Sequence, residues 1–121
     1  MINTRAVVLA STLGTVLQVA MVLAGHSTPS IAALYAVGGM GFSFIAGIAY
    51  AMWARGSTTS SLVVGGLLSG AICAFIGIFV SYLLGDVPMS LLTLGTLSSA
   101  ATGAVGGWLG KFVFPSTAVA S

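Results

Sequence analysis

The stretch GGLLSGAICAFIGIFVS, residues 65 to 81, places a small side chain at every fourth position of an uncharged apolar segment. The small residues of this stretch are Gly65, Ser69, Cys73, Gly77 and Ser81. Residues four apart lie on one face of an α-helix. Helices in lipid associate by close van der Waals contact, which small residues permit. The stretch therefore predicts a membrane-embedded helix that packs closely against another helix.

The composition of the whole chain points the same way. Of its 121 residues, 58% are hydrophobic and only 3% are charged, whereas an average soluble domain has about 25% charged residues. Disordered chains are poor in apolar residues, so disorder is excluded. The three cations form no basic run, and nucleic acid is therefore a poor partner. We expect an integral membrane protein with several spans, located in a bacterial inner (cytoplasmic) membrane.

Four apolar runs are long enough to cross a bilayer, which takes about 20 residues. They cover residues 6–24, 31–53, 62–84 and 91–114. The predicted fold class is thus an all-α bundle of four transmembrane helices in a single transmembrane domain, residues 1–121. We divide that domain into a first helical hairpin (about 6–54), a cytoplasmic loop (55–61), a second hairpin (about 62–114) and a short tail (115–121).

The short breaks between the runs contain residues that stop and start helices. We expect Gly25 and Gly85 to adopt the left-handed conformation that ends a helix. Thr28 and Asp86 are the predicted helix caps at the start of the following helices. Such short connections require neighbouring helices to run antiparallel.

The charged residues predict the orientation in the membrane. Arg5, Arg55 and Lys111 fall on one side after an even number of crossings, whereas His26 and Asp86 fall on the other side. Short cytoplasmic loops are enriched in Lys and Arg, so we expect both termini in the cytoplasm. The first run also fits a secretory signal with small residues at its end, although the internal repeat described next favours its retention as a span.

The chain resembles itself at an offset of 60 residues. The matched pairs include Gly25 with Gly85, Ser30 with Ser90, Leu34 with Leu94 and Gly47 with Gly107. Because each copy crosses the membrane twice, two tandem hairpins would form a parallel repeat about an axis along the membrane normal. All matched residues are common in membrane helices, so chance similarity remains the alternative.

Strips of small residues also occur in the second and fourth runs. The predicted helix-packing residues there are Gly39, Ser43, Gly47, Gly95, Ser99, Gly103 and Gly107. Two interpretations stay open. The strips serve packing inside one bundle, or they serve that packing together with an interface to other membrane proteins or to further copies of the chain.

The chain offers little chemistry. Gln18 is the polar anchor of the first run, and no carboxylate lies within a span, which argues against a proton-coupled exporter. Neither a nucleophile with an adjacent base nor a set of metal ligands is present, so we expect no enzyme, no metal and no cofactor. His26 is the single candidate cofactor ligand, and a solvated loop histidine is the simpler interpretation. It matches Asp86 in the other hairpin, which makes that pair the remaining candidate for catalysis.

The hydroxyls of the fourth run form the most polar stripe. Thr93, Thr96 and Thr102 either bond to their own helix or line a narrow pore. We therefore carry two functional hypotheses. The first is a non-enzymatic accessory or scaffold subunit that packs in a larger membrane complex. The second is a homo-oligomeric pore or facilitator for a small neutral solute, or a holin-like permeabilising protein.

Overall fold

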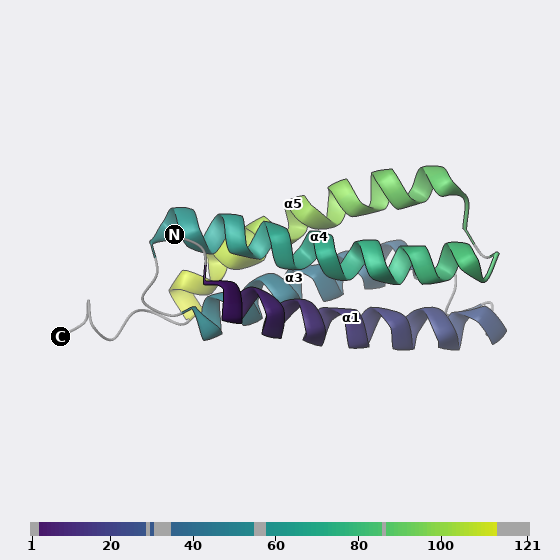
Figure 1. Cartoon of the computed structure of the whole chain (residues 1–121), viewed down its shortest axis with the longest axis horizontal. Coiled ribbons are helices and arrows are strands. Elements are labelled where there is room, and N and C mark those ends of the chain that lie inside the picture. Colours follow the sequence, from purple (N-terminus) through teal and green to yellow (C-terminus); the bar gives the residue numbers. More distant parts are fainter. Residues whose placement is uncertain (1–2, 29, 31–34, 55–57, 86, 114–121) are drawn as a thin grey trace.

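The computed structural model describes residues 3–28, 30, 35–54, 58–85 and 87–113. Within these residues the chain forms four α-helices and no strand, which confirms the predicted all-α fold (Figure 1). The helices are α1 (Thr4–Ser27), α3 (Tyr35–Trp53), α4 (Thr59–Leu83) and α5 (Met89–Val113). Several predictions fall outside the described residues: the start of the second run at 31, Leu34 of the repeat, the loop charge Arg55, the cap at Asp86, the end of the fourth run at 114 and the tail 115–121.

Three of the helix ends have a local cause. The side chain of Asn3 accepts a hydrogen bond from the Ala6 N–H at 3.0 Å, and Thr58 caps α4 in the same way through Ser61 N–H at 3.2 Å. After α4, Gly85 has a φ of 81°, the left-handed conformation that the sequence predicts for it. Polar caps therefore extend α1 and α4 beyond the apolar runs.

The corresponding prediction for Gly25 is wrong. Gly25 is buried inside α1, which continues to Ser27, and its carbonyl accepts a hydrogen bond from the Thr28 N–H at 3.3 Å. Thr28 has extended backbone angles and is the C-cap residue of α1. α1 continues past Gly25 because it ends only where Thr28 adopts extended backbone angles. This ending needs no glycine in the left-handed conformation.

Two of the helices, α1 and α4, are long and apolar enough to cross a membrane. The described apolar part of α3, Val37–Trp53, is shorter. The 25 residues of α5 equal α4 in number, but α5 has fewer Ile, Val and Phe residues and carries Lys111, so it is less apolar. Length and composition thus identify two candidate spans among the described helices.

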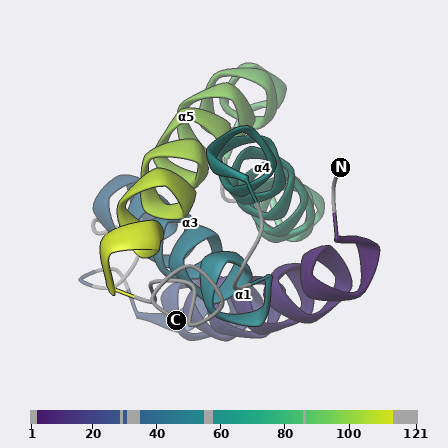
Figure 2. The same ribbon diagram turned by 90° about the vertical axis from the view of Figure 1, so that its left-hand side faces the viewer.

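The helices lie along the long axis of the molecule and alternate in direction, so α1 and α4 run parallel to each other and antiparallel to α3 and α5 (Figure 1). α5 packs against both α3 and α4, and α1 packs against α3 and α4. Seen along the bundle, α1 and α5 lie on opposite sides of it (Figure 2). The start of α1 and the end of α5 lie at the same end of the bundle (Figure 1).

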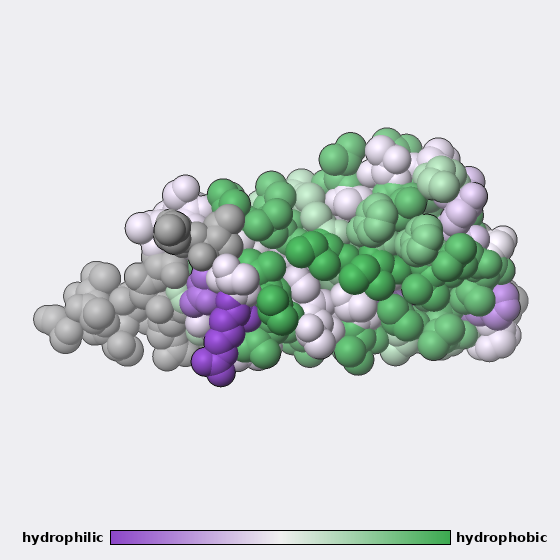
Figure 3. Space-filling model, viewed as in Figure 1, coloured by the Kyte–Doolittle hydropathy of each residue, from purple (hydrophilic) through white to green (hydrophobic). Residues whose placement is uncertain are grey.

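The distribution of residues is the reverse of that in a soluble domain. Small and polar residues fill the centre, including Ala10, Gln18, Ser43, Ser69 and Cys73. Large apolar side chains cover the outside, among them Val16, Val37, Phe75, Leu94 and Leu97. Figure 3 shows this apolar surface across the middle of one face, with the hydrophilic residues toward the two ends.

The predicted repeat stays a prediction. Gly47 and Gly107, which the offset of 60 pairs, face each other where α3 meets α5. However, α3 packs against α4, whereas α1 and α5 are not among the helix pairs that pack closely in the described part of the chain. An exact two-fold arrangement of the hairpins would make those two pairs equivalent.

Candidate functional site

Glycine residues of three helices meet where α5 crosses α3 and α4. We call this cluster the glycine seam; its residues are Gly47 on α3, Gly66 and Gly70 on α4, and Gly103 and Gly107 on α5. A Cβ atom on Gly70 would lie 2.7 Å from the Ser99 carbonyl oxygen and 3.0 Å from Gly103 Cα. A Cβ on Gly47 or Gly66 would overlap the Gly103 carbonyl oxygen. The backbones therefore touch directly, and any larger residue would have to move a helix.

Further glycines of α5 contact α3 on the adjacent face. A Cβ on Gly106 would lie 2.5 Å from the Phe44 carbonyl oxygen, and one on Gly110 would overlap the Ala51 side chain. The predicted packing strips contained neither of these two glycines. The signal that could have found them is the run of glycines at 103, 106, 107 and 110, whose spacings of three and four residues place all four along one side of the helix.

The strip of small residues along α4, from Gly65 to Ser81, faces inward. Its members Ser69, Cys73 and Ser81 are almost completely buried. Its contacts with α1 follow one register. A Cβ on Gly14 would lie 2.8 Å from Cys73 Sγ, and a Cβ on Gly77 would lie 2.8 Å from Gln18 Cβ. The small residues of α4 therefore let α1 approach closely, with Gln18 seated over Gly77.

Gln18 is also the centre of a buried polar cluster. Its amide nitrogen lies 3.2 Å from Ser43 Oγ, 3.2 Å from Cys73 Sγ and 3.4 Å from the Gly39 carbonyl oxygen. The amide has two protons, so it donates to two of these acceptors at once. The Ser43 hydroxyl lies 3.4 Å from the Gly70 carbonyl oxygen, to which it donates. The cluster joins α1, α3 and α4 by side-chain hydrogen bonds.

A second polar contact lies near the start of α1. The Tyr50 side chain is fully buried, and its hydroxyl accepts a hydrogen bond from the Asn3 N–H at 3.0 Å. The same hydroxyl lies 3.2 Å from Ser61 Oγ. The ring occupies the space beside Gly65, where a Cβ would overlap it. Tyr50 was not predicted, because a tyrosine near the end of an apolar run is equally common at a membrane surface.

The three predicted pore-lining threonines have different environments. Thr93 is exposed, whereas the hydroxyl of Thr96 is buried and has no hydrogen-bond partner among the described residues. The Thr102 hydroxyl donates to the Ser98 carbonyl oxygen of its own helix at 2.9 Å. No contact in the described part of the chain brings the three side chains together.

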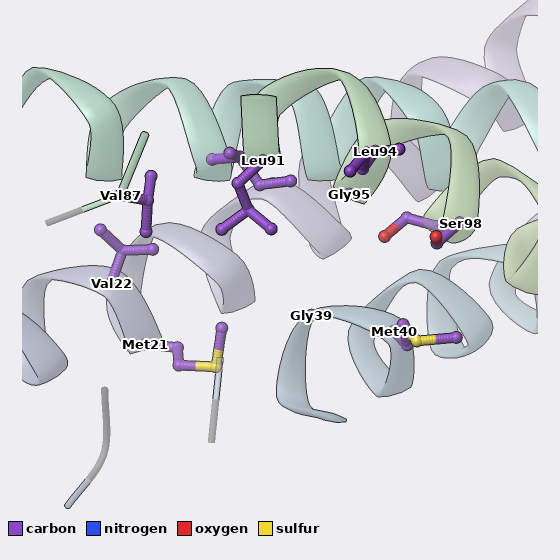
Figure 4. Close-up of a pocket in the computed structure, with 11 residues that line it drawn as sticks. Met21, Val22, Gly39, Met40, Val87, Leu91, Leu94, Gly95 and Ser98 are labelled. Atoms are coloured by element: carbon purple, nitrogen blue, oxygen red, sulfur yellow. The ribbon is translucent and has the colours of Figure 1, made fainter. Parts of the chain in front are cut away.

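A cavity of about 190 Å³ lies toward the other end of the bundle, where α5 has moved away from α3 (Figure 4). All four helices contribute to its walls. The lining residues are Met21, Val22, Gly39, Met40, Ile78, Val87, Leu91, Leu94, Gly95, Ser98 and Ser99. Apart from the hydroxyls of Ser98 and Ser99, the side chains of this wall are apolar.

A groove of about 360 Å³ follows α1 and α4 on the outer surface. Its residues are Val7, Val8, Ser11, Thr12, Thr15, Val16, Ile72 and Ile76. We call it the α1–α4 groove. The Thr12 hydroxyl donates to the Val8 carbonyl oxygen at 2.7 Å, whereas the buried Ser11 hydroxyl has no hydrogen-bond partner in the described structure. The groove thus combines three hydroxyls with apolar walls.

The formally charged side chains and the histidine of the described helices lie at the two ends of the bundle. Arg5 is exposed at the start of α1, and the Lys111 ammonium at the end of α5 lies 5.4 Å from the Trp108 ring centre and 5.0 Å from that of Phe112. His26 is exposed in the last turn of α1, at the other end. The described residues contain no group of three or more His, Cys, Asp or Glu side chains that could hold a metal ion.

Comparison with protein families, with curated proteins and with solved structures finds no match to this chain.

Proposed function

We propose that the chain is an integral membrane protein that crosses the bilayer four times with both termini in the cytoplasm. The reversed distribution of residues supports this topology, because large apolar side chains on the outside suit lipid and small residues on the inside suit close helix packing. Arg5 and Lys111 lie at the end of the bundle that this topology assigns to the cytoplasm. The cation–π contacts of Lys111 with Trp108 and Phe112 suit a membrane–water interface.

Within this topology, the protein acts as a non-enzymatic accessory or scaffold subunit of a larger membrane complex. The observation that carries this proposal is the α1–α4 groove. Most strips of small residues are used inside the bundle, but this groove brings Thr12 and Thr15 to the outer surface between bulky apolar residues. A transmembrane helix of a partner protein fits such a groove, because interhelical hydrogen bonds to hydroxyls stabilise helix association in lipid by about 1 kcal/mol each.

The homo-oligomeric pore is the second candidate. Its support is the exposed hydroxyl residue Thr93 on α5, which several copies of the chain would bring together around an axis. A passage through a single copy has less support, because the backbones touch at the glycine seam and Gln18 occupies the space between α1, α3 and α4.

Gentle extraction from the native membrane followed by native mass spectrometry tests the accessory role. We expect stoichiometric foreign subunits with the wild-type chain and their loss with Thr15→Trp, which fills the α1–α4 groove. The matched control is Phe75→Trp, a bulky substitution at an exposed position of α4 outside the groove. A closed ring of identical copies that conducts solute in vesicles would favour the pore instead, and a lone monomer would contradict both.

A further inference from the structure

Two glycines line the cavity between the four helices, and a Cβ on either would meet no backbone atom of another helix. A Cβ on Gly95 would meet only side chains, the nearest being the terminal Cδ1 of Ile78 at 2.5 Å. A Cβ on Gly39 would meet only the Gln18 side-chain oxygen, at 3.6 Å. In the glycine seam the corresponding space is filled by the backbone of another helix. The cavity is therefore the place where close helix approach ends and space is left over.

The walls of the cavity suit an apolar occupant. A buried water molecule needs about two to four polar partners, and an apolar cavity of about 150 Å³ stays dry and admits an apolar molecule. Here the volume is about 190 Å³, and the polar side chains of the wall are Ser98 and Ser99. Ser99 is only 3% exposed, and Ser98 lies at the outer rim, so most of the wall offers methyl and methylene groups.

The cavity opens to the surface that we assign to lipid. Met40 and Leu94 line it, yet they remain 42% and 64% exposed on the outside of α3 and α5. Both helices carry further large apolar residues on that outside, including Val37 and Leu97. In the proposed topology this opening lies within the membrane, so the material next to it is hydrocarbon.

We propose that this cavity binds the end of a lipid acyl chain, which enters from the bilayer between α3 and α5. The volume suits a terminal segment of one chain and is too small for a whole lipid, whose headgroup would stay outside. This inference rests on the proposed membrane topology. The acyl chain fills the space between α3 and the part of α5 that lines the cavity, so these two helices stay apart there without an empty space between them.

Photolabelling of the full-length protein in phosphatidylcholine vesicles tests this site. The probe is a phosphatidylcholine with a diazirine near the end of one acyl chain, and labelled residues are identified by mass spectrometry. We expect labels on Met21, Leu91 and Ile78 inside the cavity, together with labels on Phe75 and Phe79 on the outer face of α4.

The variant that separates the outcomes is Gly95→Leu, which fills the cavity from α5 and displaces only the flexible end of Ile78. It lowers cavity labelling about tenfold, because a leucine takes the place of several methylene groups of the acyl chain, and it leaves the labelling of Phe75 unchanged. The matched control is Gly41→Leu, since a Cβ on Gly41 has no neighbour within 4 Å and Gly41 does not line the cavity.

Each other outcome overturns a distinct statement. Equal cavity labelling in wild type and Gly95→Leu, or labelling of Phe75 and Phe79 without labelling of the cavity, overturns the acyl-chain site alone. A stoichiometric apolar molecule other than lipid, found by native mass spectrometry with the cavity unlabelled, also overturns it. The absence of label at every position, the outer face of α4 included, overturns the membrane topology and the site with it.

Discussion

The two halves of α5 pack by different rules. From Ser99 to Gly110 the backbone of α5 approaches the backbones of α3 and α4, whereas from Leu91 to Ser98 the helix meets its neighbours through side chains and lines a cavity. Both halves belong to one continuous helix, and both contain glycine. Close approach therefore follows the run of glycines on α5, part of which faces Gly47, Gly66 and Gly70, and a single glycine at position 95 does not produce it.

Gly103→Leu has the largest expected effect on the packing of α5. Overpacking costs about 1 to 3 kcal/mol where side chains can adjust, and we expect more than about 3 kcal/mol here because the obstruction is the backbone of Gly66 and Gly70. Unfolding by sodium dodecyl sulfate in mixed micelles, followed by circular dichroism, measures the loss. Gly41→Leu is the control, with no change expected. Equal unfolding of Gly103→Leu and wild type would show that the seam does not hold the helices.

Gln18→Met tests whether polar bonds contribute beyond the glycine contacts. Methionine keeps the length of the side chain but loses the donors to Ser43, Cys73 and Gly39. We expect a loss of about 1 to 2 kcal/mol in the same unfolding experiment. Leu13→Met, on the exposed face of the same helix, is the control. No loss would mean that the buried amide finds equivalent partners in the unfolded state.

Tyr50→Phe gives a smaller and more local effect. The ring remains beside Gly65, but the Asn3 N–H and the Ser61 hydroxyl lose their bond to the tyrosine hydroxyl. We expect about 1 kcal/mol of destabilisation and faster hydrogen exchange in the first turn of α1. The matched control is Tyr82→Phe on α4, which should leave that exchange unchanged. Unaltered exchange in Tyr50→Phe would show that the Asn3 cap is sufficient alone.

Gly95→Ala gives the smallest effect and tests directly whether the two halves of α5 differ in packing. Its methyl group meets the flexible end of Ile78, so we expect a change below about 0.5 kcal/mol, as at an unconstrained site. The matched variant is Gly103→Ala, whose methyl group would press on the backbone of Gly66 and Gly70. Similar unfolding midpoints of the two alanine variants would erase the distinction between the halves of α5.

Much of the fold could be predicted because its signals are local. Apolar runs predict the helices, and the ends differ by a few residues because caps such as Asn3 and Thr58 are polar and lie outside those runs. The left-handed conformation of Gly85 could be predicted because glycine adopts positive φ values easily. Gly25 could not be judged alone, because the extended backbone of its neighbour Thr28 decides where α1 ends.

The partners of each small strip could not be predicted. Every run carries small residues at helical spacing, so several pairings satisfy the pattern equally well, and no charge distinguishes them. Only the alignment of α4 with α3 and α1 in the structure shows that Gly65 makes room for the Tyr50 ring and that Gly77 makes room for Gln18. The cavity was likewise invisible, because it depends on the angle at which α5 leaves the glycine seam.

The position of Tyr50 has a consequence for the order of events during synthesis. Its ring needs the space beside Gly65, and its hydroxyl bonds both to Asn3 at the start of the chain and to Ser61. When α1 and α3 have left the ribosome, Gly65 and Ser61 of α4 have yet to join them. Until α4 is present, the Tyr50 hydroxyl has only the Asn3 N–H as its partner. The arrival of α4 provides the space beside Gly65 for the ring and the hydrogen bond to Ser61, and it thereby completes the anchoring of the amino-terminal turn.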